Sequence, residues 1–441
     1  MRTLTFSMGG IHPPDRKKAT RGVPARNAII PRTSIIPLIQ HTGASAVARV
    51  GVGDRVREGM LIGRASGSHS GNVHASTPGV VREVRPITLP DGRTSQAVVI
   101  DMDGEFDRLG KAVAPHEWSS LSSGAITRLI EENGVVCMGG APVPTHAAIQ
   151  RARKAGCTTL ILNGSESEPY LTADHRLMVE RADAVLAGLR IVARAVGAEE
   201  LIVAVERNKP DAITALERAS HDHGLRPRMV RLRVKYPQGD ERQLIQAVTG
   251  REVPSGGAPD DVRVMCIDAA TAKAVCDAVV LRQPLVERIV TVGGGGIAAP
   301  ANLKVRIGTP IADLIEECGG FSSPPAKLVA GGPLVGHTIT DLMTPITKAM
   351  RGVLALTERE VRAAPRTPCI NCGQCVTACP MGLNPARLFK FIEHDAAARA
   401  VDEGLFDCTE CGSCGYICPS RIPLVQGMRA GKTHVREGLD G

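Results

Sequence analysis

The cysteines restrict this chain more than any other feature, because eight of the 13 form two runs of identical spacing. The runs read CINCGQCVTACP from Cys369 to Pro380 and CTECGSCGYICP from Cys408 to Pro419. Each follows the pattern C-x2-C-x2-C-x3-C-P. The odd cysteine total, and an N-terminus without the apolar stretch of a secretory signal, argue against a disulfide framework. The two runs are therefore expected to bind metal.

This spacing is typical of bacterial ferredoxins that carry two [4Fe–4S] clusters, in which the fourth cysteine of each run binds the cluster of the other run. Zinc sites, the main alternative, pair two C-x2-C units and do not need a third closely spaced thiol. The pattern predicts two ligand sets, one of Cys369, Cys372, Cys375 and Cys418 and the other of Cys408, Cys411, Cys414 and Cys379.

Composition sets outer limits on the fold and its partners. A length of 441 residues suggests about three domains with sizeable cores. Charged residues make up 22% and hydrophobic residues 43%, which excludes a mostly disordered chain or a coiled coil. Aromatic residues reach only 2%, so nucleic-acid binding through base stacking is not expected. No stretch approaches the roughly 18 uninterrupted apolar residues that predict a transmembrane helix.

Residues 1–110 favour a small all-β domain, because short apolar runs alternate with turn residues. Within it, GVGDRVREGMLIG (Gly51–Gly63) and VHASTPGVV (Val73–Val81) resemble the barrel-sandwich fold of biotinyl and lipoyl carrier domains. Those carriers present a lysine at a hairpin tip for attachment of the prosthetic group. The corresponding stretch Val73–Pro78 has no lysine, so a structural role is expected instead.

From about residue 120 to residue 285, helical patterns alternate with short β-branched runs, which predicts βαβ units and a mostly parallel sheet. One helix is expected to follow Thr145 as its N-cap. Apolar residues at helical spacing predict another, long helix over Asp174–Val196. Residues 287–356 return to short strands separated by Gly and Pro, which indicates a small α+β module before the cysteine runs.

Two loops of the middle domain carry candidate ligand-binding residues. MGGAPVPT (Met138–Thr145) is a glycine-rich turn that opens a helix, where backbone N–H groups point toward a bound anion. NGSESEPY (Asn163–Tyr170) follows a predicted strand and carries two glutamates. In an αβ fold, both loops are expected at the carboxyl ends of strands, where they can form one crevice. An ordinary αβ connection without a ligand is the alternative.

These loops resemble the flavin site of the 51-kDa NADH-binding subunit family of respiratory complex I, in which GGAGFPT and N-A-D-E-S-E-P-type loops hold FMN and NADH. The whole order of segments, from GGIHPP (Gly9–Pro14) to the cysteine runs, resembles the RnfC family, the C subunits of the Rnf ion-translocating oxidoreductases. The resemblance implies a multidomain α/β chain. Its parts are an N-terminal barrel-sandwich β domain (1–115), a Rossmann-like α/β domain of FMN/NADH type (120–286), a soluble-ligand-binding β-grasp-like module (287–356) and a two-cluster ferredoxin-type α domain (359–430).

The resemblance also assigns residues to the cofactors. Glu168 is expected to face the nicotinamide nucleotide, and Asp268 and Thr271 fall where the family has an N-V-G-T segment near the flavin phosphate. The residues implied to bind FMN or NADH are Gly139, Gly140, Thr145, Asn163, Glu166, Ser167, Glu168, Tyr236, Glu241, Asp268 and Thr271.

Five positions depart from the family pattern, and one of them is Ala270, which stands where N-V-G-T has its glycine. Cys137 and Pro142 stand where the family has glycine, and the proline removes a backbone N–H. Val143 replaces a phenylalanine that stacks on the nucleotide, a contact worth roughly 0.5–1.5 kcal/mol. Asp268 replaces an asparagine and puts a negative charge where the family binds a phosphate.

The function implied is electron input to a membrane-bound Rnf-type complex. NADH would reduce FMN, and two [4Fe–4S] clusters would pass electrons singly to a ferredoxin-like, membrane-associated subunit, while other subunits translocate ions. The implied location is peripheral, on the cytoplasmic side of the cell membrane, with Arg16–Lys18 against anionic lipid or a membrane subunit. Four of these departures, Cys137, Pro142, Val143 and Asp268, leave an alternative open. It is an iron–sulfur electron relay or scaffold with a degenerate flavin site and no NADH chemistry.

Overall fold

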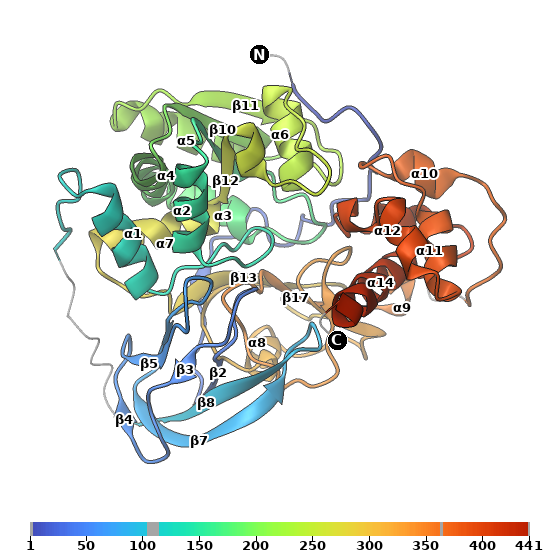
Figure 1. The fold of residues 1–441 in the computed structure, drawn as a ribbon. Helices are drawn as coiled ribbons and strands as arrows, with labels where there is room; N and C mark the ends of the chain where they lie inside the picture. The colour runs from blue at the N-terminus through green and yellow to red at the C-terminus, as the bar shows by residue number, and fades with distance from the viewer. Residues whose placement is uncertain (1–2, 104–113, 362–364, 440–441) are drawn as a thin grey trace.

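The computed structural model describes residues 3–103, 114–361 and 365–439. An α/β domain occupies the upper part of Figure 1, two β modules lie below it, and the helices of the cysteine runs pack at one side. The predicted domain limits remain predictions, and the one near residue 115 directly follows a stretch outside the described residues.

The α/β domain is built on a four-stranded parallel sheet with the order β11-β10-β9-β12. Its strands are β9 (Thr159–Gly164), β10 (Glu200–Glu206), β11 (Arg228–Leu232) and β12 (Val264–Asp268). Its helices are α1 (Ser123–Glu132), α2 (Thr145–Lys154), α3 (Ala173–Glu180), α4 (Ala182–Val196), α5 (Pro210–Asp222), α6 (Glu241–Thr249) and α7 (Ala269–Val280), with a short 3-10 helix at Pro259–Val262.

Alternation along β9 explains how helices cover both faces of this sheet. Leu160 and Leu162 are buried in the core formed with α1, α2, α4, α5 and α7, whereas Ile161 is buried in the core on the α6 side. Successive side chains of a strand point to opposite faces, so a strand buried on both faces is apolar at each of these positions. The sequence-based prediction of βαβ units is therefore confirmed.

Two local predictions in this domain are wrong. The helix predicted over Asp174–Val196 is two helices, because Arg181 adopts φ −137° and ψ 35° and interrupts the helix between α3 and α4. Thr145 is the first residue of α2 and not its cap, since Pro144 holds the N-cap position. The Thr145 amide instead donates to the Val135 carbonyl, 3.0 Å away.

Two further sheets form the N-terminal β domain around one apolar core. The larger sheet has the order β2-β8-β7-β4, with β2 (Thr33–Pro37), β4 (Arg55–Val56), β7 (Gly79–Thr88) and β8 (Thr94–Met102). The smaller one has the order β3-β5-β6, with β3 (Val47–Ala48), β5 (Leu61–Arg64) and β6 (Val73–His74).

A six-stranded mixed sheet with the order β1-β14-β13-β17-β15-β16 forms the second β module. Its elements are β13 (Glu287–Gly293), β14 (Ala301–Arg306), α8 (Ile311–Glu317), β15 (Lys327–Ala330), β16 (His337–Thr338), β17 (Gly352–Leu356) and, from the N-terminal segment, β1 (Arg26–Asn27). The helices that follow are α9 (Glu358–Val361), α10 (Gln374–Ala378), α11 (Pro385–Glu393), α12 (Ala397–Asp402), α13 (Ser413–Ile417) and α14 (Leu424–Leu439), with a 3-10 turn at Leu405–Asp407.

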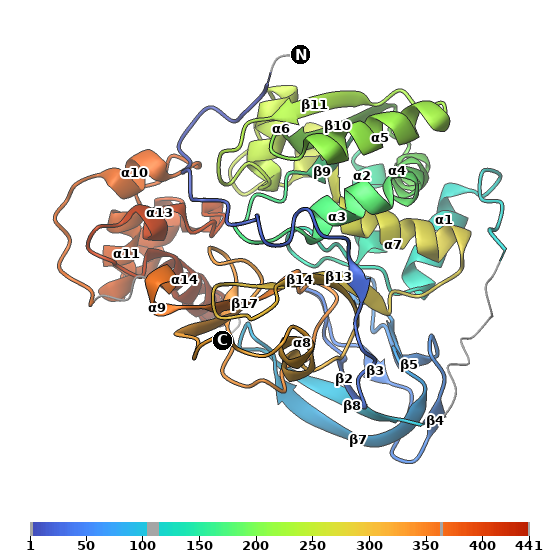
Figure 2. The ribbon, with the colours of Figure 1, turned by 180° about the vertical axis from the view of Figure 1, so that it is seen from behind.

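The N-terminal segment ties these modules together. Figure 2 shows it, in blue, running between the α/β domain and the helices around α10 and α13 before it enters the β modules. Leu4 pairs with Leu232, Ile11 pairs with Tyr236, and the Asp15 carbonyl accepts from the Tyr170 amide at 2.8 Å. These three contacts hold the segment against the α/β domain, and β1 then joins it to β14 of the six-stranded sheet.

Lys348 joins three modules from a fully enclosed position. Its Nζ donates to the carbonyl oxygens of Asn72 in the β domain (2.8 Å) and of Gly134 in the α/β domain (2.7 Å), and its backbone amide donates to Gln40. The side chain is only 1% exposed, and this burial lowers the pKa of the amine from 10.5 to about 7.

We predict that Lys348→Met lowers the thermal midpoint more at about pH 9 than near pH 7. Between pH 7 and 10.5 the unfolded chain holds a proton that the folded chain has released, so this amine favours folding increasingly as the pH rises. The methionine has no such titration and leaves two carbonyl groups without a donor. Thermal denaturation at both pH values, with the exposed Lys154→Met as control, tests this, and a difference independent of pH would contradict it.

Candidate cofactor sites

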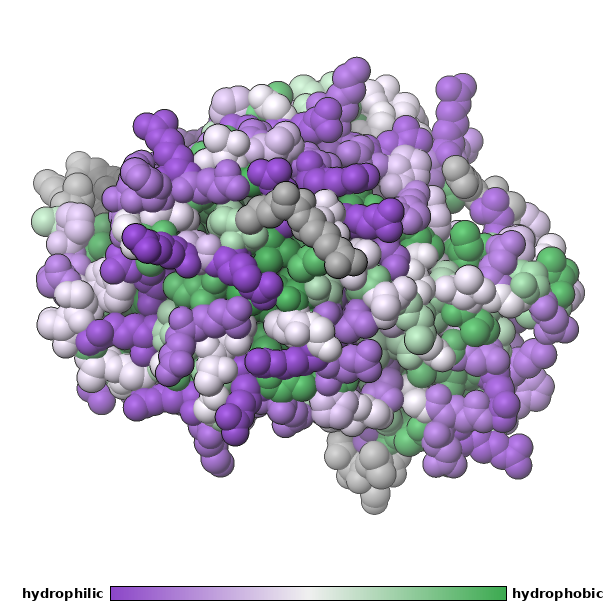
Figure 3. Space-filling view, turned by 90° about the horizontal axis from the view of Figure 1, so that it is seen from above, coloured by the Kyte–Doolittle hydropathy of each residue, from purple (hydrophilic) through white to green (hydrophobic). Residues whose placement is uncertain are grey.

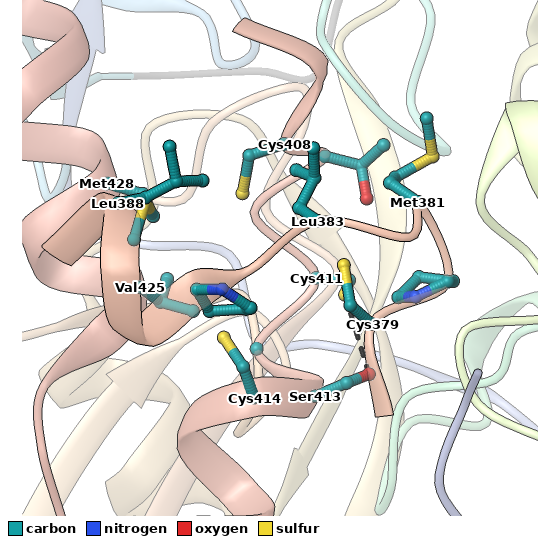
Figure 4. A pocket seen from close by; sticks show the side chains of 14 residues that line it. Cys379, Met381, Leu383, Leu388, Cys408, Cys411, Ser413, Cys414, Val425 and Met428 are labelled. Carbon is teal, nitrogen blue, oxygen red and sulfur yellow. Dashed lines mark hydrogen bonds between the residues drawn. The ribbon is translucent and has the colours of Figure 1, made fainter. Parts of the chain in front are cut away.

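One cysteine cavity lies between the two runs. Cys379, Cys408, Cys411 and Cys414 line it together with apolar side chains of α11 and α14 such as Leu388. Figure 4 shows these thiols around a shared space, with Leu383, Val425 and Met428 at its edge. We call this the buried cluster site. Sulfur donors around an apolar cavity fit a [4Fe–4S] cluster, and Cys379 comes from the other run, as the crossed pattern requires.

The remaining four cysteines of the runs lie nearer the surface, and we call them the outer cluster site. Cys369, Cys375 and Cys418 all pack against the same apolar core of this domain. Cys372 is exposed and Cys369 is half-buried. In the described part of the chain, no three His, Cys, Asp or Glu side chains converge as the ligands of a single metal ion do.

Gly9 of the N-terminal segment lies directly against the buried cluster site. It has φ +62°, and a Cβ added to it would lie 2.4 Å from the carbonyl oxygen of Cys379. The neighbouring Gly10 amide donates to the Ala378 carbonyl at 2.9 Å. Only glycine combines this backbone conformation with so close an approach. The sequence shows the Gly-Gly pair, but its partner lies at the other end of the chain.

The two predicted loops do form one crevice, a cavity of about 710 Å³ at the carboxyl ends of the parallel strands. Nine of the predicted cofactor residues line it, namely Gly139, Gly140, Asn163, Glu166, Ser167, Glu168, Tyr236, Glu241 and Asp268. Its volume lies in the range of about 300–1,000 Å³ that is usual for cofactor and ligand sites.

The glycine-rich loop presents donors to this crevice. Among the described residues, no acceptor is found for the backbone amides of Gly139 and Gly140. The adjacent Met138 amide is occupied by Thr271 Oγ1 at 2.8 Å. Unpaired amides at a loop that opens a helix suit a ligand with phosphate or carbonyl oxygens, as FMN has.

Thr145 and Thr271 do not line the crevice, and their contact with the flavin stays a prediction. Both side chains are fully buried behind the loop. Asp268 caps α7 by accepting from the Thr271 amide at 2.9 Å, and it also accepts from the Met138 amide at 3.3 Å. The aspartate that replaces the family asparagine thus has a structural partner for its negative charge, and it ties the glycine-rich loop to α7.

The two glutamates of the second loop support the crevice wall. Glu166 accepts from the amides of Asp174 (2.8 Å) and His175 (3.1 Å), and so satisfies the N-terminus of α3. Glu168 accepts from the amides of Leu334 and Val335, both at 3.1 Å, and is 5% exposed. Its carboxylate is thus engaged by the protein itself, and its expected contact with a nucleotide stays a prediction.

Three other departures from the family pattern, Cys137, Pro142 and Val143, lie in the crevice wall. Burial, followed by the charge of Asp268, raises the pKa of the Cys137 thiol to about 12, so this thiol stays protonated and unreactive. The Pro142 carbonyl accepts from the Thr42 amide at 2.9 Å, which fastens the glycine-rich loop to the N-terminal β domain. Val143 lines the crevice without an aromatic surface.

Lys17 does not reach the surface, which corrects its expected contact with lipid or a membrane subunit. It is 3% exposed, and its Nζ donates to the carbonyl oxygens of Glu166, at 2.8 Å, and of Leu171. The lysine therefore holds the second loop from behind.

The crevice also reaches the second cysteine run, which sequence reasoning did not anticipate. Thr409, Glu410 and Cys411 form part of its lining. The Tyr236 hydroxyl lies 2.6 Å from the Cys411 carbonyl oxygen and 3.1 Å from the Glu168 carboxylate, and its one proton serves one acceptor at a time. One wall thus separates the crevice from the buried cluster site.

Comparisons with known proteins account for nearly the whole chain. The matching family models are described as RnfC Barrel sandwich hybrid domain (residues 4–105), Nuo51 FMN-binding domain (130–277), SLBB domain (289–337) and 4Fe-4S dicluster domain (368–422). The chain is 41% identical over 429 residues to the C subunit of the proton-translocating ferredoxin:NAD(+) oxidoreductase complex of Clostridium ljungdahlii, covering 97% of this chain and 93% of that protein. The chain belongs to the RnfC family.

A second member of this family, the C subunit of the Na(+)-translocating ferredoxin:NAD(+) oxidoreductase complex of Acetobacterium woodii, is 39% identical over 97% of this chain and 96% of its own length. A solved NAD+-reducing [NiFe]-hydrogenase is 18% identical, with a TM-score of 0.49 over 70% of this chain and 61% of that one. The order of domains expected from the resemblance is confirmed, including an FMN-binding domain and a two-cluster [4Fe–4S] domain. None of the helices within the described ranges has the length and apolar character needed to span a bilayer.

We predict that Gly9→Ala reduces cluster content and thermal stability, because the new methyl group pushes against the Cys379 carbonyl. Gly224→Ala is a matched control, since Gly224 has the same φ of +62° but nothing within 4 Å of an added Cβ. Iron and sulfide analysis with thermal denaturation measures both variants after anaerobic reconstitution. If both variants lose cluster content and thermal stability equally, backbone strain causes the effect. That result would contradict a specific contact between Gly9 and Cys379.

Proposed function

We propose that this chain is the electron-input subunit of an Rnf-type complex, exchanging electrons between NADH and a ferredoxin-like partner. The observation that carries this proposal is the shared wall, because Cys411 lines both the crevice and the buried cluster site. A cofactor in the crevice lies beside one cluster without an intervening domain. The names of the relatives, which are subunits of ferredoxin:NAD(+) oxidoreductases, support the same assignment.

Each part of the site has a role in this proposal. FMN, when bound, exchanges a hydride with NADH and single electrons with a cluster. The Gly139 and Gly140 amides bind acceptor oxygens of the cofactor, and Asn163 holds the facing wall by donating to the Gly239 carbonyl at 2.9 Å. Glu410 at the cluster end of the crevice is paired with Arg429 and Lys432, so its charge is compensated. The two proposed ligand sets are those of the buried and outer cluster sites.

The outer cluster site supplies the exit toward a partner. Its Cys372 is exposed, and Ile370, two residues before it, is 67% exposed. Val376 and Tyr416 of the neighbouring helices are also exposed. In Figure 3, hydrophobic patches appear toward the right-hand end of the molecule, where these helices lie. We place a ferredoxin-like subunit there, with the chain peripheral on the cytoplasmic side of the cell membrane and ion translocation in other subunits.

An anaerobic visible spectrum of the chain, reconstituted with FMN and clusters, tests the proposed function. We expect bound FMN to be reduced by NADH and the cluster absorbance to bleach in the same experiment. Dithionite serves as the control that bleaches any intact cluster. If dithionite bleaches the clusters while FMN does not bind and NADH has no effect, the proposal fails and the chain is an iron–sulfur relay or scaffold.

A further inference from the structure

A second cavity, of about 230 Å³, lies where three modules meet. The tip of the β7–β8 hairpin forms one side, the glycine-rich loop forms another, and the segments around β16 and before β17 form the third. Residues contributed by these parts include Pro90, Arg93, Pro142, His337, Ala349 and Arg351. No function discussed above uses this cavity or the hairpin of the N-terminal β domain.

This cavity continues into the crevice. The two spaces share the lining residues Gly140, Pro142, Val335, His337 and Arg351. A single ligand site usually measures about 300–1,000 Å³, so the crevice of about 710 Å³ has room for one large ligand. NADH oxidation by FMN needs two large ligands side by side. The smaller cavity supplies the additional room next to the shared residues.

Arg351 stands at the junction without a partner. Within residues 3–103, 114–361 and 365–439, no hydrogen bond or ion pair of its guanidinium is found. It is half-buried, and its charge partly offsets the rise in pKa that burial causes at Glu168 and Asp174. The neighbouring cation Arg93 is held by Asp91 at 2.8 Å and by the His41 carbonyl at 2.9 Å. Of these two arginines of the smaller cavity, Arg351 is therefore the one whose guanidinium N–H groups can bind a ligand.

We propose that the smaller cavity binds the adenosine half of NAD(H) and that Arg351 binds its pyrophosphate. The proposal rests on the proposed function for the substrate class. A guanidinium presents two parallel N–H donors that match phosphate oxygens. The pyrophosphate lies in the middle of the dinucleotide, just as Arg351 lies between the two cavities. The nicotinamide half then enters the crevice, and the adenosine half lies against Pro90 and Ala349.

This assignment gives the lysine-free barrel-sandwich domain a role in substrate binding. Its hairpin lines the smaller cavity, and the Thr42–Pro142 contact holds the same domain against the glycine-rich loop. Loss of the stacking phenylalanine at Val143 is offset by a pocket built from other modules.

The test compares NADH with reduced nicotinamide mononucleotide, which lacks the AMP half and so cannot reach the smaller cavity. The full chain, reconstituted with FMN and clusters, is assayed with an artificial electron acceptor. For Arg351→Gln we expect KM for NADH to rise about 10-fold or more, and the inhibition constant of ADP-ribose to rise similarly. The KM for the mononucleotide should change little. Ala349→Leu, which fills the smaller cavity without removing charge, should act in the same direction. Arg359→Gln, which changes an exposed arginine of α9 outside both cavities, is the control.

Equal effects on both substrates, or no effect on NADH, would overturn the proposal. If the wild-type chain oxidises neither substrate, the proposed function fails, and calorimetric binding of ADP-ribose still decides the inference. Binding that Arg351→Gln weakens about 10-fold or more supports the adenosine site, whereas absent or unchanged binding overturns it.

Discussion

The hydrogen bond between the Tyr236 hydroxyl and the Cys411 carbonyl joins the two chemistries of this protein, because it lies in the wall between the crevice and the buried cluster site. Tyr236 is 5% exposed, so the bond is formed away from water, where such bonds are stronger and an unmade one is costly. The Glu168 carboxylate lies within hydrogen-bond distance of the same hydroxyl and accepts from the backbone amides of Leu334 and Val335. The position of the clusters relative to the crevice therefore depends on residues from three modules.

The modules that bind no cofactor themselves act as the frame for this wall. The N-terminal segment pairs with Tyr236, contacts Cys379 through Gly9 and supports the second loop through Lys17. Lys348 ties both β modules to the α/β domain. Such contacts between distant segments fix the position of the crevice relative to the cluster site. Separate domains on flexible linkers would not keep the two sites at a constant distance.

Local chemistry was predictable from the sequence, and long-range packing was not. The cysteine runs predict clusters because the spacing of their ligands is local, and the glycine-rich loop predicts a crevice because strand ends gather at one edge. A motif does not tell which of its members line a crevice, and Thr145 and Thr271 lie buried behind the loop. Lys17 resembles a surface cation in sequence, and its burial follows only from carbonyl partners more than a hundred positions away. The smaller cavity and the Cys411 wall likewise require segments that meet only in the folded chain.

The order of the redox centres is the central claim, and removing one cluster at a time tests it most directly. In Cys372→Ala, which disrupts the outer cluster site, rapid mixing with NADH should still bleach the remaining cluster at the rate of the wild-type chain. In Cys411→Ala, which disrupts the buried cluster site, NADH should still reduce FMN, but the outer cluster should bleach slowly or only with dithionite. Fast bleaching of the outer cluster in Cys411→Ala would contradict the claim that electrons pass from the crevice through the buried cluster site.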